Sequence, residues 1–178
     1  MTMWEMREAS EADVPAINQL VNWYIRETTV NWSWEERPLE EAYAWFASHR
    51  PPYHPIYVIV ENGELLAFGS LSSFRAKPGY WPVAENSVYV RQDCKGRGFG
   101  RALMEKLIAH ARSSGLRAIT AWISDDNTGS VLFHEKLGFY HTGTMPGVGE
   151  KFGRRLGVII MQLDLDGGVG DREQGLCG

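Results

Sequence analysis

A glycine-rich segment between an apolar stretch and an amphipathic helical pattern constrains this chain more than any other feature. It reads Lys95-Gly96-Arg97-Gly98-Phe99-Gly100-Arg101, with a glycine at every second position. Glycines spaced in this way let the backbone approach a ligand closely, and free N–H groups at the start of a helix form an anion site. The side chains of Lys95, Arg97 and Arg101 add positive charge at the same place. The segment therefore predicts a strand–loop–helix unit that binds a diphosphate group.

Other interpretations of this segment have to be weighed. A tight turn with solvated charges is one of them. A dinucleotide-binding fold is another, and it uses the order G-x-G-x-x-G followed about 20 residues later by an acid. Gly96 and Gly98 match this order and Asp125 is an available acid, but Arg101 stands at the third glycine position, and several helices and strands precede the loop. A P-loop is excluded because no Gly-Lys-Ser/Thr follows.

Hydrophobic periodicity and turn residues divide the rest of the chain into helices and strands. Ser10 and Asp13 suit a capping box before a helix, and Asn62-Gly63 is typical of a hairpin turn. The expected helices are 11–27, 38–49, 100–114 and 129–137; the expected strands are 4–7, 56–60, 65–74, 84–91, 118–123, 139–144 and 156–165. This order predicts one mixed α/β domain of the α+β type over residues 3–165, in which helices flank a largely antiparallel sheet. The glycine-rich remainder, residues 166–178, is expected to be a flexible tail.

Composition argues against several classes of function. The formal net charge is -4, whereas a general nucleic-acid binder usually carries a basic excess. Cys94 and Cys177 form no CxxC pair, and no His, Cys or carboxylate cluster has ligand spacing, so we expect no metal. The chain shows neither a signal-peptide pattern nor an apolar run long enough to span a bilayer. We therefore expect a cytoplasmic protein that binds neither nucleic acid nor membrane.

Two segments resemble motifs of the GNAT N-acetyltransferase superfamily. The loop Lys95-Gly96-Arg97-Gly98-Phe99-Gly100 is similar to its motif A, Gln/Arg-x-x-Gly-x-Gly/Ala. Asn127-x-x-Ser130 followed by Leu132-Phe133-His134-Glu135-Lys136-Leu137-Gly138-Phe139 is similar to its motif B, with His134 where many members have Tyr. The segments Ala84-Glu85-Asn86-Ser87-Val88-Tyr89-Val90, Met145–Gly149 and Lys151–Arg154 resemble the phosphinothricin and methionine sulfoximine acetyltransferases. The chain departs from this subgroup at Asn86 and over Ser72–Lys77, which leaves the substrate open.

The resemblance implies a GNAT-like fold, with acetyl-CoA as cosubstrate and no metal. It implies that an acetyl group moves to the amino group of a small amino-acid-like substrate by direct attack in a ternary complex. Backbone groups of the expected strand at Val88, Tyr89 and Val90 would bind the pantetheine arm, and the amides of the glycine-rich loop would bind the diphosphate. The implied cofactor-binding residues are Val88, Tyr89, Val90, Lys95, Gly96, Arg97, Gly98, Phe99, Gly100, Arg101, Asn127 and Ser130.

Two residues are candidate catalytic groups. Glu85 is a candidate general base because a free amine is largely protonated at neutral pH; a surface carboxylate is the alternative. His134 is a candidate to protonate the departing thiolate, and a structural helix histidine is the alternative. The candidate substrate-binding residues are Phe74, Arg75, Lys77, Glu85, Asn86 and Ser87. Arg75 and Lys77 are candidates to hold a substrate carboxylate, since arginine matches carboxylate geometry.

Other functions remain open at this level. One is a GNAT activity on a polyamine, an aminoglycoside or a peptide N-terminus, although Arg75 and Lys77 argue against a polyamine. Another is a non-catalytic sensor that binds acetyl-CoA. Relatives of this type often form dimers, so the resemblance implies a homodimer. Lys151, Phe152 and Arg154 are candidates to reach the acceptor pocket, either within one chain or across the dimer interface.

Overall fold

A computed structural model describes residues 4–165 of the chain. The expected domain, 3–165, begins one residue earlier, and the expected flexible tail, 166–178, lies outside the described residues. The helices are α1 (Val14–Glu27), α2 (Leu39–Ser48), α3 (Phe99–Ser113) and α4 (Thr128–Lys136). The strands are β1 (Glu5–Glu8), β2 (Ile56–Glu61), β3 (Glu64–Ser73), β4 (Val83–Val90), β5 (Ala118–Ser124), β6 (Tyr140–Lys151) and β7 (Arg154–Asp164).

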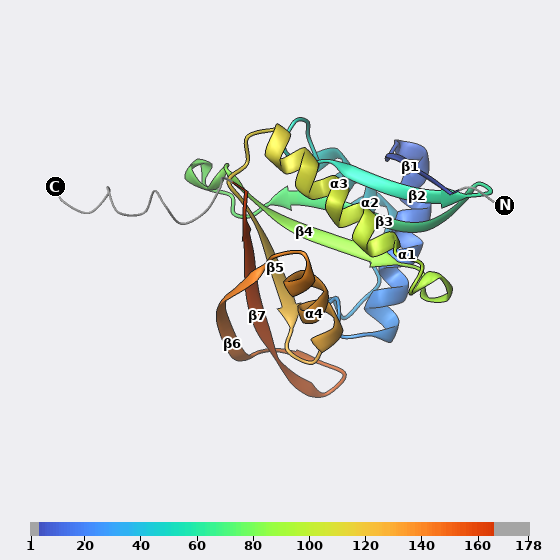
Figure 1. Cartoon of the computed structure of the whole chain (residues 1–178). Helices are drawn as coiled ribbons and strands as arrows, with labels where there is room; N and C mark the ends of the chain where they lie inside the picture. Colours follow the sequence, from blue (N-terminus) through green and yellow to red (C-terminus); the bar gives the residue numbers. More distant parts are fainter. Residues whose placement is uncertain (1–3, 166–178) are drawn as a thin grey trace.

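The seven strands form one sheet in the order β1-β2-β3-β4-β5-β7-β6. All neighbouring pairs are antiparallel except β4 and β5, which run parallel. That parallel pairing covers only Val83–Glu85 against Ala118–Thr120. Beyond Glu85 the two strands diverge, and the sheet opens between them (Figure 1).

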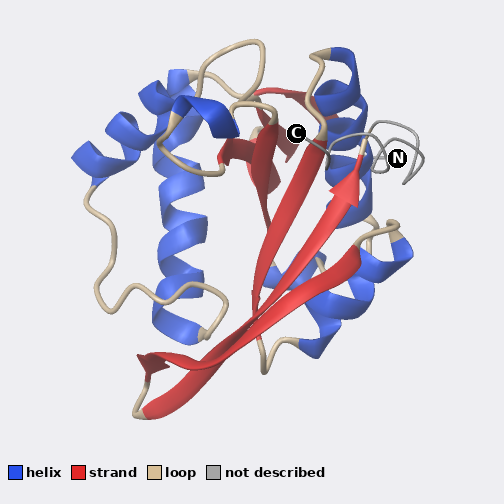
Figure 2. Cartoon of the chain, turned by 90° about the vertical axis from the view of Figure 1, so that its left-hand side faces the viewer, coloured by secondary structure: helices blue, strands red, loops and turns tan. Residues whose placement is uncertain are grey.

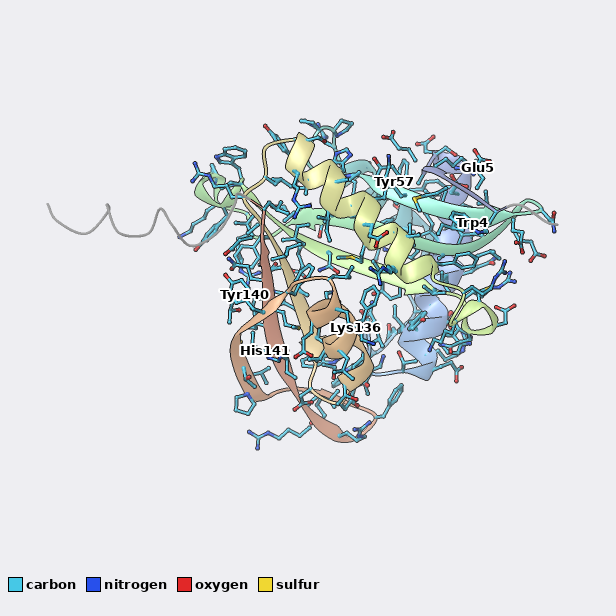
Figure 3. All side chains as sticks on the ribbon, viewed as in Figure 1. Trp4, Glu5, Tyr57, Lys136, Tyr140 and His141 are labelled. Carbon is cyan, nitrogen blue, oxygen red and sulfur yellow. The ribbon has the colours of Figure 1, made fainter. Side chains whose placement is uncertain are left out.

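Helices cover both faces of the sheet (Figure 2). The apolar side of α3, with Leu103 and Leu107, packs with strand residues and parts of α4 in the larger core cluster. The apolar side of α1, with Ile17 and Val21, packs with β2 and β3 in the second cluster on the opposite face. Tyr57 of β2 lies beneath α3 and shares a 2.9 Å hydrogen bond with Nδ1 of His110 (Figure 3).

Local signals account for most element boundaries. The capping box expected at Ser10 and Asp13 forms, and Arg7 donates to the same carboxylate at 2.7 Å. The Asn62-Gly63 turn joins β2 and β3 with φ values of 53° and 81°. Such left-handed values favour Asn and Gly. Within residues 4–165, no helix combines the length and the apolar character needed to cross a membrane.

The expected last strand pair was too short. The pattern predicted strands at 139–144 and 156–165, but β6 continues to Lys151 and β7 begins at Arg154. Pro146 and Gly147 suggested a loop, yet β6 is an edge strand, and an edge strand tolerates proline. An irregular register between Met145 and Gly149 takes up these residues, and Phe152 and Gly153 form the turn.

Candidate active site

The opening between β4 and β5 forms a cavity of about 680 Å³. Its walls come from β4, β5, the glycine-rich loop, the start of α3 and the inner side of α4. The expected cofactor-binding residues that line it are Val88, Tyr89, Val90, Lys95, Gly96, Gly98, Phe99, Gly100, Arg101, Asn127 and Ser130. Residues separated in the chain by up to about forty positions are thus brought together at one place in the sheet.

The glycine-rich loop has the geometry of an anion cradle. Gly96 and Gly98 have φ values of 82° and 83°, and a Cβ added at either would meet no atom within 4 Å. Gly98 caps α3 in the left-handed conformation without a side-chain hydrogen bond. The first N–H groups of a helix have no partner within the helix, so they are available to an anion in the cavity. This cradle fits a diphosphate, because backbone donors and open space coincide there.

The basic residues of this loop are placed differently from one another. Lys95 and Arg101 line the cavity, and Arg101 also donates to Glu105 at 2.7 Å. Arg97 does not line it; its guanidinium pairs with Glu61 at 2.8 Å on β2. Phe99 contributes its backbone at the start of α3, since its side chain is buried against Trp4. Arg97 is therefore less well placed for a diphosphate than its sequence position suggests.

The backbone of β4 turns alternate residues toward the opening. The N–H of Arg91 donates to the carbonyl of Leu66, and the register of the two strands then pairs Tyr89 with Phe68 in the same way. Alternate residues of an antiparallel strand bond to the same neighbour, so the backbone groups of Val88 and Val90 face away from β3. The hydroxyl of Tyr24 donates to the Val90 carbonyl at 2.7 Å. Val88 is left with backbone groups directed into the gap.

The start of α4 forms the opposite wall. Asn127 caps this helix, and its side-chain oxygen accepts the N–H of Ser130 at 3.2 Å. One turn later, Nδ1 of His134 lies 2.7 Å from the Ser130 carbonyl, and Nε2 lies 3.2 Å from Oδ1 of Asn86. His134 is buried between the rings of Phe133 and Phe139. Burial lowers the pKa of His134, while the Ser130 carbonyl acts in the opposite direction.

Glu85 lies on the other face of β4. Strand residues alternate between faces, and Val88 and Ala84 pack toward α3, so Glu85, Ser87 and Tyr89 face α1 and α2. Burial raises the pKa of the Glu85 carboxyl, and the charge of Arg75 partly offsets this. A carboxylate with a raised pKa is better matched to proton transfer near neutral pH.

The loop after β3 brings Arg75 to this face. The Arg75 guanidinium stacks on the rings of Phe74, at 4.3 Å, and Trp122, at 4.8 Å. Lys77 is exposed and lies in the same loop, before a short turn. Phe74, Arg75, Lys77 and Glu85 do not line the 680 Å³ cavity, whereas Asn86 and Ser87 do.

A second cavity of about 480 Å³ lies against the face that carries Glu85. Ser87 and Tyr89 line both this cavity and the first one. Arg37 and Trp45 form part of its wall, with the Arg37 guanidinium 4.9 Å above the Trp45 ring. Nη2 of Arg37 is buried without a partner, and burial lowers the pKa of this group.

The tip of the β6–β7 hairpin holds the loop after α1 in place. Lys151 is buried within its own chain, and its ammonium donates to the carbonyls of Ile25 and Asn31. The Asn31 side chain in turn donates to the Tyr89 hydroxyl at 3.4 Å. Phe152 is exposed beside Lys151. The amine of Lys151 therefore holds, within its own chain, the loop that carries Asn31 to the second cavity.

A family model described as the acetyltransferase (GNAT) family matches residues 17–139. This chain belongs to the GNAT family. It is an acetyltransferase, as the resemblance of its two motifs implied.

Known relatives of this GNAT chain cover nearly all of it. The L-methionine sulfoximine/L-methionine sulfone acetyltransferase of Pseudomonas aeruginosa is 39% identical, over 90% of this chain and 94% of the relative. The phosphinothricin N-acetyltransferase of Streptomyces coelicolor is 35% identical, over 84% and 90% of the two chains. A putative acetyltransferase from Salmonella typhimurium, solved with its cofactor acetyl-CoA, has a TM-score of 0.88 and 33% identity, over 98% and 99% of the two chains.

Acetyl-CoA is the cosubstrate of this GNAT enzyme. The cavity between β4 and β5 has the backbone cradle and the strand groups of Val88 that could hold it. Within residues 4–165, no group of three His, Cys, Asp or Glu side chains is arranged to hold a metal ion. The sequence interpretation missed Trp122 and Arg37, which lie on the same face as Glu85. The sequence did carry a signal for Trp122. It stands between Ala121 and Ile123, whose side chains belong to the core on the α3 side, so its own side chain points to the opposite face of the sheet.

Proposed function

We propose that this acetyltransferase moves the acetyl group of acetyl-CoA to the amino group of a small amino-acid-like acceptor. Acceptors of the methionine sulfoximine or phosphinothricin type are favoured by the names of its relatives. The observation that carries the proposal is a pair of adjoining cavities, one in the gap between β4 and β5 and the other on the α1 side of β4, which share Ser87 and Tyr89. Two such cavities suit a cosubstrate and an acceptor bound at the same time, and therefore direct attack in a ternary complex.

Each face of β4 has its own role in the proposed reaction. Glu85 takes a proton from the acceptor ammonium group, directly or through a water molecule. The N–H of Val88 faces the gap and stabilises the developing negative charge on the thioester oxygen. His134, on the opposite face from Glu85, gives a proton to the departing sulfur. Acetyl-CoA supplies the activated acyl group when it is bound.

Recognition of the acceptor is proposed to use charge on both sides of Glu85. An amino acid carries a carboxylate and an ammonium group, so its pocket needs both signs of charge. Arg75, held against Trp122 and Phe74, provides a planar guanidinium near Glu85 for the carboxylate. Arg37 lines the second cavity, which Arg75 and Glu85 do not, and is the other cation proposed to bind the carboxylate.

We infer that the catalytic unit spans residues 3–165 and forms a homodimer. Support for the dimer comes from the exposed edge strand β6 and from exposed apolar side chains at its tip, including Met145, Val148 and Phe152. A free, buried Cys94 suits a reducing compartment such as the cytoplasm.

A thiol-release assay tests the function. Purified protein is given acetyl-CoA with methionine sulfoximine, methionine sulfone, phosphinothricin, a polyamine, an aminoglycoside or a peptide, and free CoA is followed over time. The proposal expects turnover that is fastest with the three amino-acid analogues. Fastest turnover with a polyamine, an aminoglycoside or a peptide would overturn the acceptor class. Calorimetric binding of acetyl-CoA without turnover on any amine would instead indicate a sensor.

A further inference from the structure

Asn86 occupies the point at which β4 and β5 separate. The last paired residues are Glu85 and Thr120, and the side chain of the next β4 residue reaches across the gap. Nδ2 of Asn86 donates to the carbonyl of Thr120 at 2.9 Å. In an unbroken ladder a backbone N–H would bond such a carbonyl. The side-chain amide therefore replaces a ladder hydrogen bond that the opening of the sheet removes.

This bond determines which way the Asn86 amide faces. A carbonyl only accepts hydrogen bonds, so the NH₂ group must point to Thr120 and the amide oxygen must point away from it. That oxygen, Oδ1, lies 3.2 Å from Nε2 of His134. Turning the amide over would place two acceptors against each other at the Thr120 end. The wall of the cofactor cavity thus presents an acceptor to Nε2.

The other ring nitrogen of His134 also faces an acceptor. Nδ1 lies 2.7 Å from the Ser130 carbonyl, while the Ser130 hydroxyl is farther away at 3.4 Å. A neutral imidazole has one N–H, whereas an imidazolium has two. Both contacts are satisfied at once only when both nitrogens carry a proton. Without the Asn86 oxygen, the Ser130 carbonyl alone would select a proton on Nδ1 and leave Nε2 bare.

The remaining surroundings of His134 carry no charge that would replace this contact. The groups packed against the ring are Ser130 on α4, Asn86 on β4, and the rings of Phe133 and Phe139. The charged side chains that line the same cavity are Lys95 and Arg101, both positive. Burial also opposes protonation of this histidine. Of these groups, the amide oxygen of Asn86 is therefore the one that favours hydrogen on Nε2.

We propose that Asn86 is a positioning residue whose amide oxygen, held toward His134 by Thr120, accepts hydrogen from Nε2 and so favours the doubly protonated imidazolium at the wall of the cofactor cavity. This rests on the proposed function, in which the C–S bond of the thioester breaks as the acceptor nitrogen bonds to the acetyl carbon. The acceptor ammonium loses two protons in all, one that passes to solvent through Glu85 before the attack and one that goes to Glu85 as the C–N bond forms, and Nε2 gives one proton to the departing sulfur. Exchange with solvent then returns a proton to His134 and removes one from Glu85. A negatively charged sulfur is a stronger acceptor than a neutral amide oxygen, so the hydrogen can leave Asn86 for it.

Nitrogen-15 NMR of the histidine rings tests the placement of the proton in the free, full-length protein, without any need for activity. His134 signals are assigned with a His134→Asn variant and followed from pH 5 to pH 9. The wild-type ring is expected to carry hydrogen on both nitrogens below its protonation midpoint and on Nδ1, beside the Ser130 carbonyl, above it. Asn86→Leu, which removes both amide groups at similar size, is expected to lower the protonation midpoint by about half to one pH unit.

Two further variants keep the test decisive. Asn86→Asp places a carboxylate beside Nε2 and should raise the midpoint, so the order Asp, Asn, Leu is expected. Thr120→Val removes a hydroxyl at the same place but leaves the carbonyl that holds Asn86, and it should leave the His134 signals unchanged. An Asn86→Leu midpoint equal to that of the wild type, or an Asn86→Asp midpoint no higher than that of the wild type, would overturn the proposal. If Asn86→Leu does not fold, the Asp variant still decides it.

Activity separates this inference from the proposed function. If His134 donates the proton, Asn86→Leu should lower kcat roughly three- to tenfold at pH 8, as the expected shift of the midpoint implies, with a smaller change in the KM for acetyl-CoA. Normal kcat in His134→Asn would reject the catalytic role of the histidine, and the spectra would still report whether Asn86 sets its proton. A normal spectrum combined with a tenfold loss in Asn86→Leu would show that Asn86 acts by another route and would overturn the proposal.

Discussion

Replacing Gly98 with alanine tests whether the loop before α3 binds the diphosphate through its backbone. Gly98 caps α3 with φ 83° and ψ 3°. A non-glycine residue in this left-handed region costs about 1–2 kcal/mol, and no atom lies within 4 Å of the added Cβ, so no clash adds to this cost. For a chain of this size, such a loss corresponds to a fall in Tm of roughly 2–8 °C.

The same methyl group should affect ligand binding much more than it affects folding. It would project where an anion has to approach the first N–H groups of α3. Losing one backbone hydrogen bond to a charged group costs about 1.5–3 kcal/mol, which corresponds to a roughly 10- to 100-fold rise in the Kd for acetyl-CoA. Isothermal titration calorimetry measures the Kd, and a thermal melt without ligand measures the stability of the same sample.

Gly63 offers a matched control. It lies in the β2–β3 turn with φ 81°, an added Cβ would again meet nothing within 4 Å, and it does not line the cavity. Gly63→Ala should therefore lower Tm by a similar amount and leave the Kd for acetyl-CoA unchanged. Equal affinity in the two variants would refute the assignment of the loop as the diphosphate site.

Three further predictions concern single side chains. Glu85→Gln should lower kcat roughly 100-fold or more and flatten the dependence of kcat on pH. In the wild type, activity should fall as pH drops through the raised pKa of Glu85. The same pH profile in both proteins would contradict this role. Lys151→Met leaves two carbonyls without their donor, so Tm should fall by about 5 °C or more and the KM for the acceptor should rise. The control Lys136→Met, on the exposed side of α4 (Figure 3), should change neither Tm nor this KM. Arg7 lowers the pKa of Asp13 to about 2, so this carboxylate stabilises the fold above its ordinary pKa, and that stability is lost as pH falls toward 2; melts of Asp13→Asn should lack this part of the acid dependence.

The elements of the fold could be predicted wherever a local signal determines the backbone. The box at Ser10, the turn at Asn62-Gly63 and the left-handed cap at Gly138 each use a residue suited to its conformation. The strand β6 lacked such a signal. Its Pro146 and Gly147 are acceptable only because β6 lies at the edge of the sheet, and strand order depends on contacts distant in the sequence.

The candidate site was predictable in part, for the same reason. Gly96 and Gly98 have left-handed φ values that their residue type favours, so the sequence pattern was sufficient to predict a tight loop before α3. The contact of Asn86 with His134 depends on where two strands separate, and the pairing of Arg97 with Glu61 depends on the neighbouring β2. Neither is visible in the spacing of residues along the chain.

The division of labour between the two faces of β4 has an evolutionary consequence. The cavity on the α3 side offers backbone amides and glycines, which few substitutions can alter without strain. The cavity on the α1 side is walled by side chains such as Arg37 and Trp45, which a single codon change can replace. Selection can therefore broaden or redirect the range of amines that a descendant of this enzyme accepts, while its use of acetyl-CoA is inherited unchanged.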